Sequence, residues 1–179
     1  KKSQYGDFYQ LGLMTGMRRG EIAGLKWAAV NLANHQLQVV NTLQRITGQG
    51  LVNGQPKTER SRRSIALSED TVSLLHEIRG KQITQQLEVA DAWTDSGYVF
   101  TDAAGLPLDP NMMTRAFKVV ISTAGLPKLT IHGIRHTHAT ILMEKGVSPK
   151  VVSERLGHAS VATTMDIYSH VIPSMQEEA

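Results

Sequence analysis

The sequence predicts a mainly α domain of the α+β class that contains a small antiparallel sheet. Helix start and stop signals recur along most of the chain, whereas one stretch near residues 36–66 is rich in β-forming residues. The chain has 179 residues, of which 41% are hydrophobic, and this is enough to bury the core of a single domain.

The first 25 residues predict two helices that meet at Thr15-Gly16. Apolar positions recur at helical spacing on both sides of this break: Phe8, Leu11 and Met14 before it, Ile22 and Leu25 after it. Arg18 follows the break directly, so its side chain is expected to project from the start of the second helix.

The segment from Gln36 to Leu67 predicts a three-stranded antiparallel sheet. The string "QLQVVNTLQRI" is rich in β-formers, "GQGLVNGQP" supplies turn residues, and "RRSIAL" is a short extended piece. This places Lys57 on or beside the second turn of the sheet.

Helices are expected again in the rest of the chain. Ser68 begins one, Asp109-Pro110 and Gly125 bracket another, a third runs from about Ile134 to Lys145, and Ser148-Pro149 begins a fourth that ends at Gly157. A last short helix follows Ser160 and carries Tyr168, and "YVF" at residues 98–100 is expected to form a strand.

Composition narrows the class of protein. The chain has no cysteine, which excludes disulfide frameworks and thiol catalysis, and it has no apolar run long enough for a membrane span and no leader sequence. We therefore expect no membrane association and an intracellular location. Because the chain begins without methionine, we also expect it to be a fragment of a longer protein.

Positive charge is clustered rather than large. The net charge is +3, and the candidate phosphate-binding residues are Arg19, Arg60, Arg62 and Arg63, beside Arg18 and Lys57. An ordinary solvated surface is the alternative for any one of these groups.

The stretch "HGIRHTH" places three histidines and an arginine within seven residues. On a helix, His132 and His136 share a face, but His138 lies roughly 240° around from His132, and no acidic residue completes a metal site. Arg135 projects beside His132, and this pair suits a phosphate better than a cation. The alternative for His136 and His138 is a purely structural role, in which they cap the helix or pack in the fold.

Five segments, in this order, resemble the sequence boxes of the catalytic domain of the tyrosine recombinases, the phage integrase family of site-specific DNA recombinases. They are "TGMRRGEI", "PKTERSRRSIAL", "HGIRHTHAT", "LGHASVATT" and "TMDIYSHV", within a resemblance from Leu11 to Val171. The resemblance implies this catalytic-domain fold for residues 1–179, with a C-terminal tail from about residue 170. It also implies a catalytic set of Arg18, Lys57, His132, Arg135, His158 and Tyr168, supported by Glu21 and His136. Since the hairpin is longer than is common in the family, Arg60 is an alternative to Lys57.

The chemistry of that family needs these residue types. A tyrosine attacks the DNA phosphorus to form a 3′-phosphotyrosyl link, while arginines and a histidine stabilise the charge that develops on the phosphate oxygens. Such a mechanism uses no metal or nucleotide cofactor. The resemblance also implies a location in the cytoplasm of a bacterial cell or phage-infected host. The implied partners are double-stranded DNA and, on two synapsed duplexes, further copies forming a homotetramer, although the isolated domain could be monomeric.

Two other functions are compatible with the same residues. A type IB topoisomerase shares the tyrosine, arginine and histidine chemistry but reseals the same strand, and a DNA-binding module could retain the fold without catalysis. The order of the five segments and their amino-acid sequences favour the recombinase.

Overall fold

The predicted mainly α architecture with a small antiparallel sheet is confirmed in the computed structural model, which describes residues 5–55 and 62–168. The helices are α1 (Gly6–Thr15), α2 (Arg19–Ala23), α3 (Glu69–Val89), α4 (Pro110–Thr123), α5 (Ile131–Glu144), α6 (Pro149–Leu156) and α7 (Val161–Tyr168). The strands are β1 (Val30–Asn31), β2 (Gln36–Val39), β3 (Thr42–Ile46), β4 (Gly50–Gly54) and β5 (Arg63–Ala66), with short 3-10 turns at Trp27–Ala29 and Ala90–Ala92.

The strands form one three-stranded sheet and one separate hairpin. In the sheet, β2 lies between β1 and β5 and is antiparallel to both, with Leu37 opposite Ile65. The hairpin pairs β3 with β4 and was not predicted: the segment that we expected to supply turn residues is itself a strand. Leu51 and Val52 pair with β3, while Gly48 and Gly50 adopt positive φ angles and take up the turn.

The helix starts follow the predicted capping residues. The side chains of Ser68, Asp109 and Ser148 accept hydrogen bonds from backbone N–H groups at the starts of α3, α4 and α6. Helix α5 begins earlier than expected, at Ile131, because the hydroxyl of Thr130 caps it in the same way. This brings His132 into the first turn of the helix.

The predicted strand at residues 98–100 is wrong. Tyr98 makes only an isolated bridge to Lys26, and Val99 and Phe100 are buried without belonging to a strand. The ring of Phe100 packs edge-on against that of Phe8, with 5.2 Å between centroids. These three apolar residues therefore fill the core from a loop.

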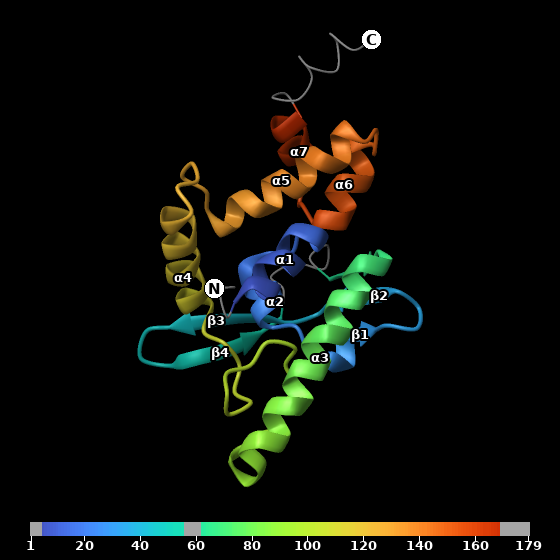
Figure 1. Cartoon of the computed structure of the whole chain (residues 1–179). Helices are drawn as coiled ribbons and strands as arrows, with labels where there is room; N and C mark the ends of the chain where they lie inside the picture. Colours follow the sequence, from blue (N-terminus) through green and yellow to red (C-terminus); the bar gives the residue numbers. More distant parts are fainter. Residues whose placement is uncertain (1–4, 56–61, 169–179) are drawn as a thin grey trace.

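Helix α1 lies at the centre of the molecule, against α5 and α3, while α6 and α7 pack together beside α5 (Figure 1). Its buried residues Phe8 and Leu11 join the main core with residues of α3, α4 and the sheet. A smaller cluster of Ala139, Met143, Val152 and Leu156 joins α5 to α6. The end of α1 also meets the end of α6, since a Cβ on Gly16 would lie 2.5 Å from the side chain of Leu156.

None of the helices in the described ranges combines the length and the apolar character that a membrane-spanning segment requires.

Candidate active site

A cleft of about 750 Å³ lies between β3, the starts of α2 and α5, the first turns of α4, and the loop that follows α6. Arg18, His132 and Arg135 all line it. Gly157 and Ala159, on either side of His158, line it as well. The structure thus brings together residues from widely separated parts of the sequence at one concave surface.

Arg18 is held at the start of α2 but stays accessible. Its backbone N–H and its guanidinium donate to the two carboxylate oxygens of Glu21, each at 2.8 Å, and the guanidinium also donates to the carbonyl of Gly157 at 3.0 Å. The side chain of Arg18 is 40% exposed. Its charge is therefore oriented by the protein and open to a ligand in the cleft.

Arg135 is fixed more deeply, with a relative exposure of 3%. Its guanidinium donates to the carbonyls of Gly16 and Leu156, both at 2.7 Å. Burial, and then the charge of Arg18, lower the pKa of Arg135 to about 9, so the group still carries its positive charge at neutral pH. An anion in the cleft would relieve the repulsion between the two guanidinium groups.

The last residues of α6 organise the arginines. Three successive carbonyls, of Arg155, Leu156 and Gly157, accept hydrogen bonds from Arg63, Arg135 and Arg18 respectively. The carboxyl end of a helix carries a partial negative charge, which favours cations there. Gly157 ends the helix in the left-handed conformation, with φ at 66°. The helix end therefore gathers three positive charges at one place.

Arg63, which was expected to contact DNA, turns its side chain towards the interior of the site. Its side chain is only 6% exposed, and it donates to both carboxylate oxygens of Glu21, at 3.1 and 2.9 Å. Although burial opposes the ionisation of Glu21, hydrogen bonds and charge from Arg63, with hydrogen bonds from Arg18, lower the pKa of this carboxyl. The ionised Glu21 therefore holds Arg18 and Arg63 together, and Arg63 belongs to the interior of the site.

His158 follows the glycine that ends α6 and is half-buried. Its Nδ1 lies 2.8 Å from the hydroxyl oxygen of Thr164 on α7. Burial, and then the charges of Arg135 and Arg18, lower the pKa of His158 to about 4, so the ring is neutral at neutral pH.

His132 and His136 lie together on one face of α5, as predicted. Their rings meet edge-to-face, with 4.7 Å between centroids. Burial, the neighbouring His136 and the two arginines of the cleft lower the pKa of His132. Among the described residues, no three histidine or acidic side chains come close enough to hold a metal ion.

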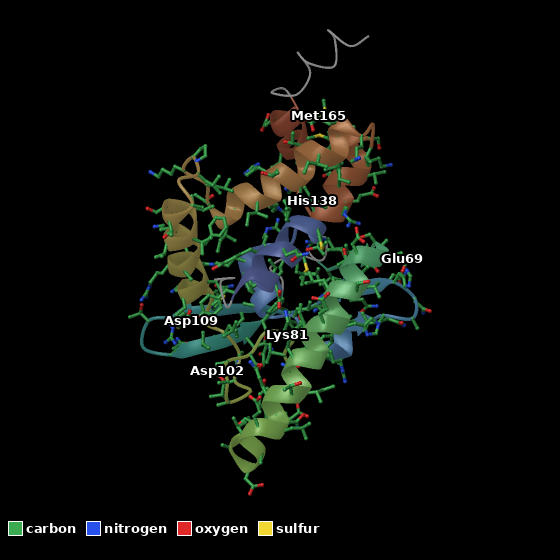
Figure 2. All side chains as sticks on the ribbon, in the orientation of Figure 1. Glu69, Lys81, Asp102, Asp109, His138 and Met165 are labelled. Carbon is green, nitrogen blue, oxygen red and sulfur yellow. The ribbon has the colours of Figure 1, made fainter. Side chains whose placement is uncertain are left out.

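His138 lies on the opposite side of α5, where it packs between α1 and α6 (Figure 2). Its Nδ1–H donates to the carbonyl of Leu13 at 2.8 Å, and its Nε2 accepts from Arg155 at 3.2 Å. Burial, and then Arg155, lower its pKa to about 4. His138 is thus a packed, neutral core residue, in agreement with its predicted position away from His132.

The structure describes only some of the remaining predicted residues. Arg19 lines the cleft and donates to the hydroxyl of Thr114 at 2.6 Å, whereas Arg62 is exposed and donates to Gln55. Lys57 and Arg60 lie outside the described residues. Tyr168 is the last residue of α7, one helical turn beyond Thr164, and its side chain lies outside the described part of the structure.

Sequence reasoning missed Thr164 and Arg155. Arg155 binds a histidine 17 residues away and two carbonyls more distant in the sequence, so no local pattern identifies it. For Thr164 one signal exists: it lies four residues before Tyr168 and therefore on the same face of a helix.

Comparisons with known proteins identify the family of the chain. A sequence profile described as "Phage integrase family" matches residues 4–175. The chain belongs to the phage integrase family. A "Tyrosine recombinase XerC-like" protein from Caldanaerobacter subterraneus subsp. tengcongensis is 33% identical over 182 residues, which cover 96% of this chain and 46% of that protein. The ICEBs1 integrase of Bacillus subtilis is 30% identical, with 97% and 47% covered.

The integrase fold is also shared with solved structures. The Tn1549 transposon integrase in complex with transposon right end DNA superposes with a TM-score of 0.76 at 26% identity, over 92% of this chain and 54% of that one. The present integrase-family chain spans about half the length of the curated relatives that it matches.

Proposed function

We propose that this chain, residues 1–179, is the catalytic domain of a site-specific DNA recombinase that cleaves and rejoins DNA strands through a 3′-phosphotyrosyl intermediate. The observation that carries the proposal is the cleft in which Arg18, His132 and Arg135 meet beside the loop of His158. The DNA-bound Tn1549 integrase, which shares the fold, supports double-stranded DNA as the substrate.

The arginines act on the charge of the reacting phosphate. In the pentavalent transition state the non-bridging oxygens gain negative charge, and donors already fixed around them stabilise that charge without reorganising. Arg135 contributes a cation whose position is set by two carbonyls, and Arg18 contributes a more accessible one whose position is set by Glu21 and Gly157. Both arginines are therefore already in position to stabilise negative charge that develops on a phosphate between them.

The proton transfers require two further groups. The phenol of Tyr168 attacks phosphorus and forms the Tyr–O–P bond, and because a phenol has a pKa of ~10 it must lose its proton to an acceptor as it attacks. The lowered pKa of His132 favours its neutral form, which is the form that accepts a proton. The bond from phosphorus to the 5′-oxygen breaks, and Lys57 supplies the proton that makes this oxygen a hydroxyl. That hydroxyl later attacks the phosphotyrosine of a partner strand.

The recombination reaction joins two duplexes, so we propose that the complete protein acts as a homotetramer on synapsed DNA. No metal or nucleotide cofactor enters the proposed steps, since the bond energy is kept in the phosphotyrosyl link and the positive charges come from the protein.

A nicked suicide substrate tests the proposal. When the protein is incubated with such DNA in EDTA, a protease-sensitive covalent adduct should accumulate with wild-type protein and be lost in Tyr168→Phe. Cleavage that stops on chelation and survives the loss of Tyr168 would show a metal-dependent nuclease instead. Relaxation of plasmids that lack any recognition site would favour a topoisomerase.

A second substrate separates the proton donor from the charge-stabilising groups. Replacing the 5′-bridging oxygen by sulfur gives a leaving group that hardly needs a proton, so cleavage by Lys57→Ala should recover whereas Arg135→Ala should stay slow. Recovery of Arg60→Ala rather than Lys57→Ala would move the assignment to Arg60.

A further inference from the structure

The orientation of His158 is controlled from the helix that carries Tyr168. Nδ1 of His158 lies 2.8 Å from the hydroxyl oxygen of Thr164, and Thr164 has a relative exposure of 0%. With Nδ1 occupied in this way, Nε2 is the ring nitrogen left for a ligand. In a neutral imidazole only one of the two nitrogens carries a hydrogen, so the direction of the bond to Thr164 decides whether Nε2 donates or accepts.

The direction follows from the hydrogen of the threonine hydroxyl. A threonine in a helix can donate this hydrogen to the carbonyl four residues earlier. In the part of the chain that the structure describes, four other helical threonines do so, with oxygen–oxygen distances of 2.6 to 3.3 Å: Thr15, Thr84, Thr114 and Thr137. Within the described ranges, the hydroxyl of Thr164 has His158 as its one recorded partner.

A buried hydroxyl hydrogen without an acceptor costs free energy, so the Thr164 hydroxyl must donate to Nδ1. Nδ1 is then the unprotonated nitrogen, and the ring hydrogen resides on Nε2. His138 has the opposite tautomer. Its Nδ1 faces the carbonyl of Leu13, and because a carbonyl can only accept a hydrogen bond, the ring hydrogen of His138 must reside on Nδ1.

We propose that Thr164 is a positioning residue that holds His158 in the Nε2–H tautomer, so that a neutral imidazole donates a hydrogen bond to a non-bridging oxygen of the DNA phosphate. This rests on the proposed recombinase function for the identity of the acceptor. Because Thr164 and Tyr168 share α7, the donor is set correctly only when the helix of the nucleophile is docked.

The tautomer matters because His158 is surrounded by positive charge. Arg135 and His136 reach it from α5, Arg18 from the start of α2 and Arg63 from β5, and together with burial they keep the ring neutral at neutral pH. A neutral ring with its hydrogen on Nδ1 would turn a lone pair towards the phosphate oxygens and repel them. The hydrogen of the Thr164 hydroxyl thus decides whether His158 attracts or repels the phosphate oxygens.

The tautomer can be measured directly, without DNA. Two-bond ¹H–¹⁵N spectra of the imidazole groups should show His158 with its hydrogen on Nε2 in the wild-type chain and in Thr164→Ser. Thr164→Val keeps the shape but removes the hydroxyl, so a substantial Nδ1–H population should appear. Thr163→Val, on the exposed side of the same helix, is the matched control and should leave the spectrum unchanged.

A wild-type spectrum with the hydrogen on Nδ1 would overturn the proposal, and so would an unchanged Nε2–H tautomer in Thr164→Val. If Thr164→Val does not fold, the wild-type and Thr164→Ser spectra still decide the tautomer. Since no step of this experiment depends on DNA cleavage, it can fail while the recombinase proposal stands, and the reverse is also true.

The effect on the reaction has its own signature. Losing one such donor should slow adduct formation on the suicide substrate about 10²-fold in Thr164→Val, with Thr164→Ser and Thr163→Val close to wild type. Lowering the pH should reduce the ratio of the wild-type rate of adduct formation to that of Thr164→Val. A protonated imidazole has hydrogens on both nitrogens, so Nε2 then donates in both proteins. A ratio that stays constant with pH would assign Thr164 a packing role only and contradict the proposal.

Discussion

Three arginines from different elements, Arg18, Arg63 and Arg135, bind consecutive carbonyls at the end of α6, and Glu21 neutralises part of their charge. The sequence indicated Arg18, Arg135 and Glu21 through their local boxes. It did not show that Arg63 binds Glu21, because the cluster "RSRR" shows positive charge but not which side chain turns inward. The alternation of a strand decides that, since Arg63 and Ile65 in β5 point to the same side and Ile65 is buried.

Replacing Arg63 should therefore affect stability more than DNA contact. Arg63→Ala leaves Glu21 buried with fewer partners, and breaking a buried ion pair in this way costs about 3–5 kcal/mol. The matched control Arg62→Ala removes an exposed arginine and should change the free energy of unfolding by less than about 0.5 kcal/mol. Urea denaturation followed by circular dichroism measures both. Equal stability of the two variants, with DNA affinity lost in Arg63→Ala, would contradict this and identify Arg63 as a DNA contact.

The buried histidines predict how stability depends on pH. His138 has a pKa of about 4 in the folded protein against an ordinary value of 6.5, so between these values the unfolded chain binds more protons. The free energy of unfolding should thus fall as the pH falls from 6.5 towards 4. In His138→Phe this slope should be smaller, even if the variant is less stable at neutral pH. Urea midpoints at a series of pH values test this, and an unchanged slope would be inconsistent with the assignment.

At the scale of elements, the starts and ends of helices were largely predictable because capping residues act within a few positions of sequence. Ser68, Asp109 and Ser148 all cap the helices expected of them. The hairpin of β3 and β4 was missed because glycines on both sides of Leu51 and Val52 resemble a turn. Leu51 and Val52 pair with β3, and Leu43 of β3 is buried in the core; local composition shows neither contact.

The close packing of the ends of α1 and α6 predicts how substitution of Gly16 affects stability. Gly16 has φ at 67°, and a Cβ there would lie 2.5 Å from Leu156 and 2.6 Å from His138, so Gly16→Ala should combine backbone strain with overpacking. Gly125 has nearly the same φ, 65°, but nothing within 4 Å of a Cβ. Gly125→Ala should cost about 1–2 kcal/mol and Gly16→Ala about 1–3 kcal/mol more. Similar thermal midpoints for the two variants would contradict this packing.

At the scale of the whole molecule, the cleft depends on contacts between distant parts of the chain. The bond from Arg18 to the carbonyl of Gly157 joins positions 139 residues apart, and that from Arg135 to Gly16 joins positions 119 apart. No periodicity predicts such pairs, so only the resemblance of five ordered segments indicated that these residues meet. The structure adds what the resemblance does not contain: the three consecutive carbonyls at the end of α6, the inward Arg63, and the bond between His158 and Thr164.

The most direct test of the account is to identify the atom that becomes attached to DNA. Wild-type protein trapped on a suicide substrate should give, after digestion, one peptide in which Tyr168 carries a nucleotide through its 3′-phosphate, as read by tandem mass spectrometry. Attachment at another residue, linkage through a 5′-phosphate, or cleaved DNA without any attached peptide would contradict the account.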